Sequence, residues 1–596
     1  MNIQVIPNPS PLPTCWKLVS SVFSRVTVLA ATLALFGGQF SARAQWDNWD
    51  DGDDMSPPVL WGHLDPIFDA SGGVSIPNVY DASSGSYHLI AVPGTSGFGN
   101  PRTLALPTNS ASYVYSDFYV SVDVVAWSLS TAQAFGLGAR VSDLGAGTTD
   151  GYAFGLACGG AVLSGQNYIR ILRLENEATK DVLGSGPTGT SVVPIPDLIP
   201  GTTYRLVFMG RGTDLEGRLY QLPNLTTPIA AVSGNTAGDS IILTNGYSGL
   251  LAFGLNENLA ADVTFDNYYA SKRVPLKITD MVVKDNFNDG NDTAPTMNWD
   301  HYDPIYLAGQ GQLPPQDHWF FPSGAYRLTA DPSPDPGTLG AARVGSLDAT
   351  PHTDFRISID LVGFDPNVNN NMAVGLLARV TNPGPGSTDG YGMTFQTQPN
   401  QHDIDLIRIH GEQPDGPGAE NFRLDSDDSL KDIDFTTNTV RMVFVGQGNQ
   451  LRGLVFKLPE TMNPLVDCMA TDTNLPLYTA GISAVFGFDN GGLTGVDVTF
   501  DNYSDTPIVP PAVVATIGAA NTGEVNITWP GNAEGVWVLQ SSSSVSPGAV
   551  WTQVATTTTT GLAGKIIYNP ATGKNTYTGS LPMAATGSTF YRLKQM

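Results

Sequence analysis

The chain has 596 residues, of which 41% are hydrophobic and 14% charged, and it contains 65 glycines and 43 prolines. The low charged fraction excludes a coiled coil, and the apolar fraction is too high for a wholly disordered chain. The net charge is −26, and 46 of the 55 acidic residues are aspartates. Because aspartate favours turns, this composition predicts a β protein. Because an acidic chain repels phosphate backbones, the charge argues against nucleic-acid binding.

The N-terminus has the pattern of a secretory signal peptide. Lys17 and Arg25 lie close to an apolar run at 26–36, and Ala42-Arg43-Ala44 offers a small-x-small cleavage site. We expect a signal peptide at 1–44, and its removal, which takes three basic residues and no acidic one, would change the net charge from −26 to −29. The apolar run is too short to span a bilayer. The protein is therefore expected to be secreted, extracellular or at the cell surface, with no membrane insertion after signal removal.

An internal repeat relates residues 47–68 to residues 285–306. Eleven of these 22 positions are identical without a gap, and matching motifs follow in the same order at an offset of 235 to 239. The sequence therefore predicts two tandem domains, called here the first repeat (45–277) and the second repeat (278–507). Cys158 and Cys468 fall at non-equivalent positions of the two repeats, so a disulfide between them is not expected.

The strand patterns predict an all-β fold. Residues 355–361 and 496–500 alternate apolar and polar side chains with period two, which marks half-buried strands. Residues 374–380 and 441–445 are more continuously apolar, as expected of inner strands covered on both sides. Because no 3.6-residue period appears after the signal, we expect two tandem antiparallel jelly-roll β-sandwiches, followed at 508–596 by a small C-terminal β-sandwich.

The order of motifs in both repeats resembles the concanavalin A-like lectin/glucanase superfamily, especially its laminin-G-like and 3-keto-disaccharide-hydrolase-like branches. In the second repeat these motifs lie at 285–290 (DNFNDG), 375–379 (GLLAR), 390–391 (GY), 406–412 and 500–502 (FDN). The resemblance implies jelly rolls of two curved sheets that meet ligands on the concave face or the loop rim.

The C-terminal module resembles immunoglobulin- or fibronectin-like sandwiches of secreted bacterial proteins. The resemblance is carried by residues 538–542, 551–554 and 590–594. It implies no activity for this part of the chain.

The aspartate-rich openings of the repeats are candidate structural calcium sites, since Ca²⁺ takes six to eight oxygen ligands. First and last strands commonly lie side by side in such sandwiches, so late residues can join the openings. The EF-hand pattern is not met, and the alternative is an aspartate-rich turn that caps strand ends. The candidate ligands are Asp47, Asp51, Asp53, Asp54 and Asp266 in the first repeat, and Asp285, Asp289, Asn291, Asp292 and Asp501 in the second.

Two arginines and two tyrosines are candidate ligand-binding residues. Arg140 and Arg379 lie within apolar strands, and Tyr152 and Tyr391 follow across the next turn. A guanidinium can grip a polar ligand and a tyrosine can stack on a sugar ring. The alternative is that the arginines point inward and belong to a structural network.

The remaining polar motifs predict structural roles. His63 and His301 recur in W-x-H-x-D-P, and with few His or Cys residues nearby a His–Asp hydrogen bond is expected in place of zinc. No E-x-D-x-x-E string of the glucanases is present, and Glu175-Asn176-Glu177 has the wrong spacing. We expect no catalytic residues, although enzymatic activity stays open.

The leading hypothesis is a secreted, non-catalytic protein that binds extracellular carbohydrate or another polymer through its concanavalin A-like domains. Two tandem domains would add avidity if both reach one polymer. The alternatives are a glycan-active hydrolase of the same superfamily and a structural spacer of a cell surface or matrix.

Overall fold

The computed structural model describes residues 45–507, with gaps in the loops, and from 508 to 596 only the backbone of seven strands. The predicted signal peptide at 1–44 lies outside the described residues. Every regular element described is a β-strand, apart from one 3₁₀ turn at Pro322–Gly324. All strand pairs between named strands are antiparallel, so the predicted all-β class is confirmed.

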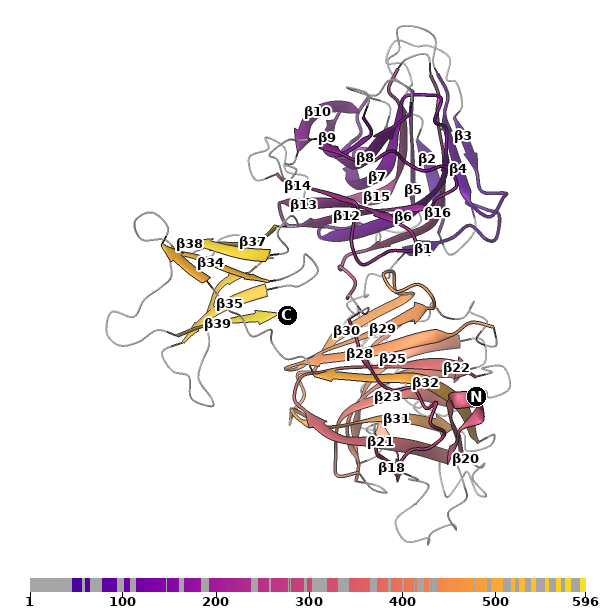
Figure 1. Cartoon of the computed structure of the whole chain (residues 1–596), viewed down its shortest axis with the longest axis vertical. Coiled ribbons are helices and arrows are strands. Elements are labelled where there is room, and N and C mark those ends of the chain that lie inside the picture. The colour runs from indigo at the N-terminus through magenta and orange to yellow at the C-terminus, as the bar shows by residue number, and fades with distance from the viewer. Residues whose placement is uncertain are drawn as a thin grey trace, which may run out of the picture. The chain divides into compact units, whose positions relative to one another are not determined.

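The first repeat consists of two eight-stranded sheets that enclose one core (Figure 1). In the sheet called here A1, the strand order is β14-β13-β12-β6-β16-β4-β3, with β1 on β16. In the sheet called B1, the order is β10-β9-β8-β7-β15-β5-β2, with β11 on β9. The strands are β1 Gln45–Asp47, β2 Trp61–Leu64, β3 Val79–Asp81, β4 Tyr87–Ala91, β5 Arg102–Pro107, β6 Phe118–Trp127, β7 Gln133–Ser142, β8 Asp150–Cys158, β9 Tyr168–Glu175, β10 Ala178–Leu183, β11 Val193–Pro194, β12 Tyr204–Arg211, β13 Asp214–Gln221, β14 Ala230–Asn235, β15 Tyr247–Gly254 and β16 Ala261–Ser271.

The second repeat has the same strand order. Its sheet A2 runs β19-β20-β32-β22-β28-β29-β30 with β17 on β32, and its sheet B2 runs β18-β21-β31-β23-β24-β25-β26 with β27 on β25. The strands are β17 Val283–Asp285, β18 Trp299–Tyr302, β19 Trp319–Phe320, β20 Tyr326–Ala330, β21 Ala342–His352, β22 Phe355–Gly363, β23 Met372–Thr381, β24 Asp389–Gln398, β25 Gln401–His410, β26 Gln413–Pro414, β27 Arg423–Asp427, β28 Val440–Gln447, β29 Gln450–Lys457, β30 Val466–Thr471, β31 Gly481–Asp489 and β32 Val496–Pro507.

The first and last strands of each repeat are hydrogen-bonded neighbours, as expected. Asp47 is paired with Tyr268, and Asp285 with Tyr503. The aspartate-rich segment that follows each first strand therefore lies beside the last strand of the same repeat.

The central strands of sheets B1 and B2 are buried on both faces. In β15, Leu250 and Ala252 belong to the core between the sheets, whereas Leu251 and Phe253 belong to a second apolar cluster on the other face. In β23, every residue except the last is buried, which confirms the prediction for 374–380. This burial on two faces explains why these strands are apolar throughout and do not alternate.

The tryptophan of the repeated W-x-H motif anchors each core. Trp61 lies with its ring centroid 4.9 Å from that of Tyr268 and 5.4 Å from that of Trp49. In the second repeat Trp299 has the same neighbours, Tyr503 at 4.8 Å and Phe287 at 5.8 Å. Edge-to-face aromatic pairs of this kind contribute about 0.5–1.5 kcal/mol beyond their buried area.

The two described cysteines are buried thiols in different repeats. Cys158 ends β8 and Cys468 lies in β30, and both are at most 1% exposed. Burial raises the pKa of the Cys158 thiol to about 12. At neutral pH this thiol is therefore fully protonated and unreactive.

The C-terminal segment is described as backbone only. It forms a four-stranded sheet, β33-β34-β38-β37, and a three-stranded sheet, β36-β35-β39. The sequence predicts five strands in this module, at 525–529, 536–541, 551–554, 565–568 and 589–593. All five are present, and two more, β33 and β38, join the larger sheet. The strands are β33 Thr516–Ala519, β34 Val525–Pro530, β35 Trp537–Ser542, β36 Thr552–Thr556, β37 Gly564–Asn569, β38 Lys574–Gly579 and β39 Phe590–Gln595.

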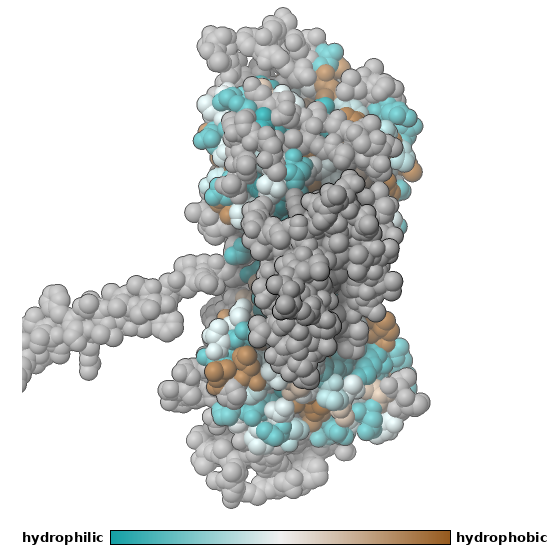
Figure 2. Space-filling model, turned by 90° about the vertical axis from the view of Figure 1, so that its left-hand side faces the viewer, coloured by the Kyte–Doolittle hydropathy of each residue, from teal (hydrophilic) through white to brown (hydrophobic). Residues whose placement is uncertain are grey.

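The described surface is mainly polar. On the face shown in Figure 2, the hydrophobic residues form small groups among hydrophilic ones. The most exposed large apolar side chains are Leu475 and Val282, at 82% and 72%. A search of the described residues for a helix long and apolar enough to cross a membrane finds none.

Candidate functional site

The face of sheet B1 that points away from the core is the candidate functional site. Its floor consists of apolar side chains that are 0–8% exposed: Leu104, Leu106, Val141, Ala153, Leu172 and Leu251. Tyr247, Phe253 and Leu174 pack against this floor and are only partly buried. Contact with a ligand would therefore fall to these half-buried side chains and to the polar groups around them.

Two aromatic side chains lie toward one end of this face. Tyr168 begins β9 and packs with Ala134 and Ala157, and Phe253 is part of the same cluster. The guanidinium of Arg170 lies 5.4 Å from the centroid of the Tyr168 ring, within cation–π distance. The Tyr168 hydroxyl is buried and has no hydrogen-bond partner among the described residues. A buried hydroxyl without a partner costs free energy unless a ligand or water satisfies it.

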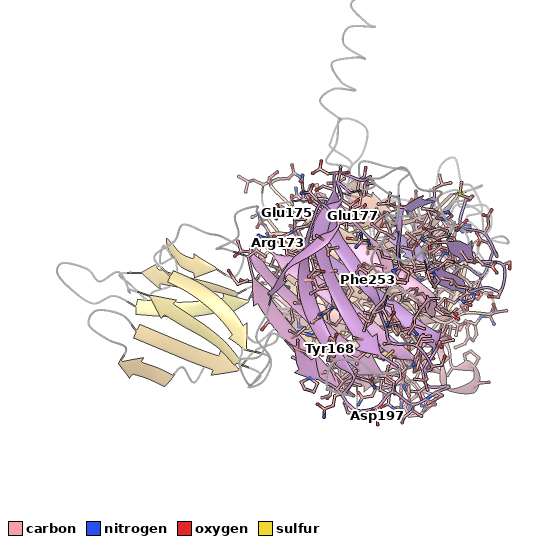
Figure 3. All side chains as sticks on the ribbon, turned by 90° about the horizontal axis from the view of Figure 1, so that it is seen from above. Tyr168, Arg173, Glu175, Glu177, Asp197 and Phe253 are labelled. Carbon is pink, nitrogen blue, oxygen red and sulfur yellow. The ribbon has the colours of Figure 1, made fainter. Side chains whose placement is uncertain are left out.

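Charged side chains gather near the β9–β10 turn. Figure 3 shows Arg173, Glu175 and Glu177 close together, with Phe253 between them and Tyr168 in this view. Arg173 lies 3.8 Å from Glu175, and Glu177 lies 3.7 Å from Arg102. Burial raises the pKa of Glu177, although a backbone hydrogen bond from Gly147 and the charge of Arg102 oppose this rise. The spacing of these glutamates in the sequence did not indicate the arginines beside them.

The predicted ligand-binding residues lie inside the sandwiches. Arg140 and Arg379 are 2% and 1% exposed, and Tyr152 and Tyr391 are completely buried. Each arginine occupies a β-bulge with a φ of +50°, and this conformation interrupts the alternation of the strand. This burial favours the structural role over contact with a ligand.

The hydrogen bonds of the two arginines show what they stabilise. Arg140 donates to the carbonyls of Ser116 and Gly212, at 2.8 and 2.6 Å. Arg379 donates to the carbonyls of three backbone segments, those of Thr353, Gly448 and Tyr478, at 2.5–3.0 Å. Each guanidinium therefore satisfies backbone carbonyls in separate loops, which connect different strands of its repeat.

A close backbone approach at the same place requires glycine. A Cβ on Gly481 would lie 2.3 Å from the carbonyl carbon of Arg379, and a Cβ on Gly246 would lie 2.3 Å from that of Arg140. These glycines let the neighbouring strand pass directly against the arginine bulge.

The predicted calcium ligands of the first repeat already accept hydrogen bonds. Asp47 accepts from the Trp49 N–H at 2.9 Å and from the Trp61 indole at 2.8 Å. Asp51 accepts from the N–H of Asp53, and Asp53 from that of Met55, which is the pattern of consecutive Asx turns.

The two remaining ligands of the first repeat are also engaged. Asp54 lies 2.7 Å from Nε2 of His63, and Asp266 accepts from the N–H of Asn267. Burial raises the pKa of Asp47 to about 7 and that of Asp266 to about 6. The hydrogen bonds of these carboxyls within the turn favour the capping alternative.

The second repeat repeats these contacts. Asp285 accepts from the Phe287 N–H at 2.8 Å and from the Trp299 indole at 2.9 Å. Asp289 accepts from the N–H of Asn291, which in turn accepts from the N–H of Thr293.

The last two predicted ligands of this repeat have the same kind of partners. Asp292 pairs with His301, and Asp501 accepts from the N–H of Asn502. Calcium binding stays a prediction, since the described openings hold their aspartates in turns and caps.

The repeated histidines form the expected hydrogen bonds to aspartate. Their partners are Asp54 and Asp292, nine residues before His63 and His301. Each imidazole also stacks on an aromatic ring, His63 on Tyr80 and His301 on Trp319, with ring centroids 3.9 Å apart. The prediction of a structural His–Asp pair in this motif is confirmed.

Two ion pairs that the sequence did not indicate, one buried and one partly buried, stabilise sheets A1 and A2. Arg205 pairs with Asp123 through two hydrogen bonds of 2.6 and 2.9 Å, and Arg441 pairs with Asp360 at 2.6 and 2.8 Å. The side-chain amide of Asn267 also donates to Asp123, and that of Asn502 donates to Asp360. Such fork-like pairs are structural at these positions.

The comparisons with known proteins return solved structures only. No protein-family model and no curated protein matches the chain. The chain is similar to the carbohydrate-binding module CBM66 from Bacillus subtilis (14% identity, TM-score 0.20, 30% of this chain and 85% of the module). It is also similar to the VIP36 exoplasmic/lumenal domain bound to Ca²⁺ and Man3GlcNAc (13%, 0.26, 35% and 85%). A third is a lichenase from a mouse hindgut metagenome (14%, 0.26, 38% and 100%).

These neighbours are concanavalin A-like lectin and glucanase folds. At such identities and TM-scores the likeness says nothing about function. The architecture of this chain rests on its own strand order, which the two repeats share.

Proposed function

We propose that this protein is a secreted, non-catalytic binding protein that engages an extracellular carbohydrate polymer through the outer face of sheet B1. The observation that carries the proposal is the half-buried ring of Phe253 on this face, which lies in one cluster with Tyr168 and is paired across the strands with Arg102, the partner of Glu177. Ligand sites are mostly apolar with a few convergent polar groups, and this face has that composition.

The chemistry of the face suits a sugar. Aromatic rings present an apolar surface to the C–H groups of a pyranose, and tyrosine adds a polar hydroxyl. The Tyr168 hydroxyl is buried, so stacking on a sugar ring would fall to the half-buried Phe253 beside it. Because the chain has a net charge of −26, a neutral polysaccharide is favoured over an anionic one.

The second repeat does not present the same groups. Strand pairing places Asp403 and Asp405 of β25 where β9 has Tyr168 and Arg170. The aromatic residue Phe488 of β31 occupies the position of Phe253. We therefore assign the binding surface to the first repeat alone.

A matched pair of variants tests this assignment. Affinity electrophoresis of residues 45–596 through gels with neutral polysaccharides should show retardation by at least one polymer. The Phe253→Ala variant should bind that polymer about tenfold more weakly, because an aromatic contact contributes roughly 1.4 kcal/mol. The Phe488→Ala variant, which removes the equivalent ring of the second repeat, should migrate like the wild type.

Two outcomes would contradict the proposal. Unchanged mobility of the wild type across the whole panel would contradict carbohydrate binding and favour a role as a structural spacer. Equal retardation of wild type and Phe253→Ala, with both folded by circular dichroism, would show that the polymer binds elsewhere on the chain.

One observation favours a glycan hydrolase as a second candidate function. The raised pKa of Glu177, next to Glu175, is a property of the general acid in glycosidases. A hydrolase would release reducing ends from the retarding polymer, and Glu177→Gln would abolish the release. Binding without any release of reducing ends would instead support the non-catalytic proposal.

A further inference from the structure

A buried cluster of polar side chains joins the two sheets of the second repeat. Asp348 and His352 lie on β21 of sheet B2, and Asp505 lies on β32 of sheet A2. One ligand atom from each residue lies within 4.8 Å of the other two. His352 Nε2 is 3.1 Å from a carboxylate oxygen of Asp505, and the three side chains are only 2–3% exposed.

The cluster gathers two buried carboxylates around one ammonium and one imidazole. Lys284 Nζ lies 2.5 Å from Asp348 and 3.5 Å from Asp505, so one ammonium faces two buried carboxylates. The other oxygen of Asp505, Oδ1, is buried and accepts no hydrogen bond from the described residues. Buried carboxylates need cationic or hydrogen-bonding partners, so this arrangement has room for a further positive charge.

Asp348 accepts hydrogen bonds from Lys284, from the Thr350 N–H at 3.0 Å and from the Tyr503 hydroxyl at 3.3 Å. Asp505 also lies within hydrogen-bonding reach of Asp348. Two carboxyl groups in such contact require a shared proton or a cation between them.

The first repeat has no equivalent cluster, so the fold itself does not require one. Strand pairing places Pro107 where Asp348 stands, since these residues face Trp61 and Trp299 respectively. Tyr115 faces Gly246 as His352 faces Gly481. Ala270 takes the place of Asp505, and Trp46 that of Lys284. Every group that could bind a cation is specific to the second repeat.

We propose that this cluster binds one divalent transition-metal ion of the zinc type, with His352 Nε2 and one carboxylate oxygen each from Asp348 and Asp505 as ligands. Imidazole with carboxylate oxygens is a donor set for zinc and related ions, whereas Ca²⁺ and Mg²⁺ prefer oxygen alone. The 3.1 Å between His352 Nε2 and Asp505 suits neighbouring ligands bound at about 2.1 Å.

The structure indicates how the ion would be accommodated. Lys284 is 27% exposed and already donates to the exposed Thr350 hydroxyl, so its ammonium can leave the carboxylates along this side. Ser483 Oγ lies 3.1 Å from His352 Nε2 and offers a further oxygen. The bound ion would fasten β21 to β32, and therefore sheet B2 to sheet A2.

Cobalt is the probe for this site, since its visible absorption reports coordination by nitrogen and oxygen. Residues 45–596, freed of metal by chelator, should bind one Co²⁺ per chain, and Zn²⁺ should displace it while Ca²⁺ and Mg²⁺ do not. His352→Gln and Asp505→Asn should weaken Co²⁺ binding about a hundredfold or more. Even the loss of a residue that only hydrogen-bonds to a metal ligand typically lowers metal affinity about 10- to 100-fold. His301→Gln, which alters an exposed histidine of the same repeat, should leave the stoichiometry at one.

The Lys284→Met variant tests whether Lys284 competes with the metal ion or only stabilises the fold. If Lys284 competes with the ion, this variant should bind Co²⁺ about tenfold more tightly than the wild type. Absence of Co²⁺ binding by the wild type would overturn the proposal and leave Lys284 and a proton, on His352 or between the carboxyls, as the balancing charges. Binding that survives in His352→Gln, with native circular dichroism, would also overturn it, because the ion would then lie elsewhere.

Discussion

Replacing Arg379 with methionine is expected to destabilise the second repeat by roughly 4 kcal/mol. The guanidinium is 1% exposed and donates to the carbonyls of Thr353, Gly448 and Tyr478. Methionine has a similar length but no donor, so three buried carbonyls would lose their partner. Each unsatisfied group costs about 1–3 kcal/mol. Urea unfolding followed by circular dichroism measures the change.

Arg327→Met is the matched control for this prediction. Arg327 also forms two hydrogen bonds to a carboxylate, that of Asp497, but these side chains are 43% and 49% exposed. Exposed ion pairs contribute about 0–1 kcal/mol, so this variant should unfold almost like the wild type. If Arg379→Met were equally mild and instead abolished polymer binding, the ligand-binding hypothesis for Arg379 would replace the structural one.

The protein is expected to be more stable at mildly acidic pH than at pH 8. Burial raises the pKa of Asp47 to about 7, and hydrogen bonds from Trp61 and Trp49 only partly oppose this rise. The folded state therefore binds this proton more tightly than the unfolded chain, in which the pKa is about 3.9. The resulting stabilisation is present below about pH 4 and is lost as the pH rises toward 7. For Asp47 alone it amounts to about 4 kcal/mol.

Two variants distinguish the contribution of Asp47 to this pH dependence from the general charge repulsion within an acidic chain. Asp266, Asp285 and Asp501 also have pKa values raised mainly by burial, so they act in the same direction. Asp47→Asn should reduce the difference in unfolding free energy between pH 4 and pH 8, while Asp143→Asn, which removes an exposed charge elsewhere in the first repeat, should not. Identical pH profiles for wild type and Asp47→Asn would refute the prediction.

Much of the fold was predictable because side-chain periodicity reports directly on burial. The alternation at 355–361 corresponds to β22, but the prediction that this strand is half-buried was wrong, because its polar residues Ser358 and Asp360 are buried as well. The apolar run at 374–380 lies inside the doubly buried β23. Strands β33 and β38 escaped prediction, since their sequences, TIGA and KNTYTG, contain few apolar residues at a regular spacing. Periodicity cannot indicate strands whose side chains do not separate into two faces.

The sites were less predictable, because they depend on contacts between distant residues. A polar residue within an apolar strand, such as Arg379, fits an inward structural role and a ligand role equally well until its acceptors are known. Asp348 and Asp505 are 157 positions apart and meet only across the two sheets. One sequence signal could have indicated them: alignment of the repeats places charged residues opposite Pro107 and Ala270.

The two buried cysteines give each repeat its own chemical reporter. Cys158 and Cys468 belong to the cores of different repeats, and neither thiol can meet a reagent while its sandwich stays closed. The rate at which each thiol is alkylated therefore measures how often that one sandwich opens, by mass spectrometry of a single sample. Cooperative opening would label both thiols together, whereas independent opening would label them at two separate rates.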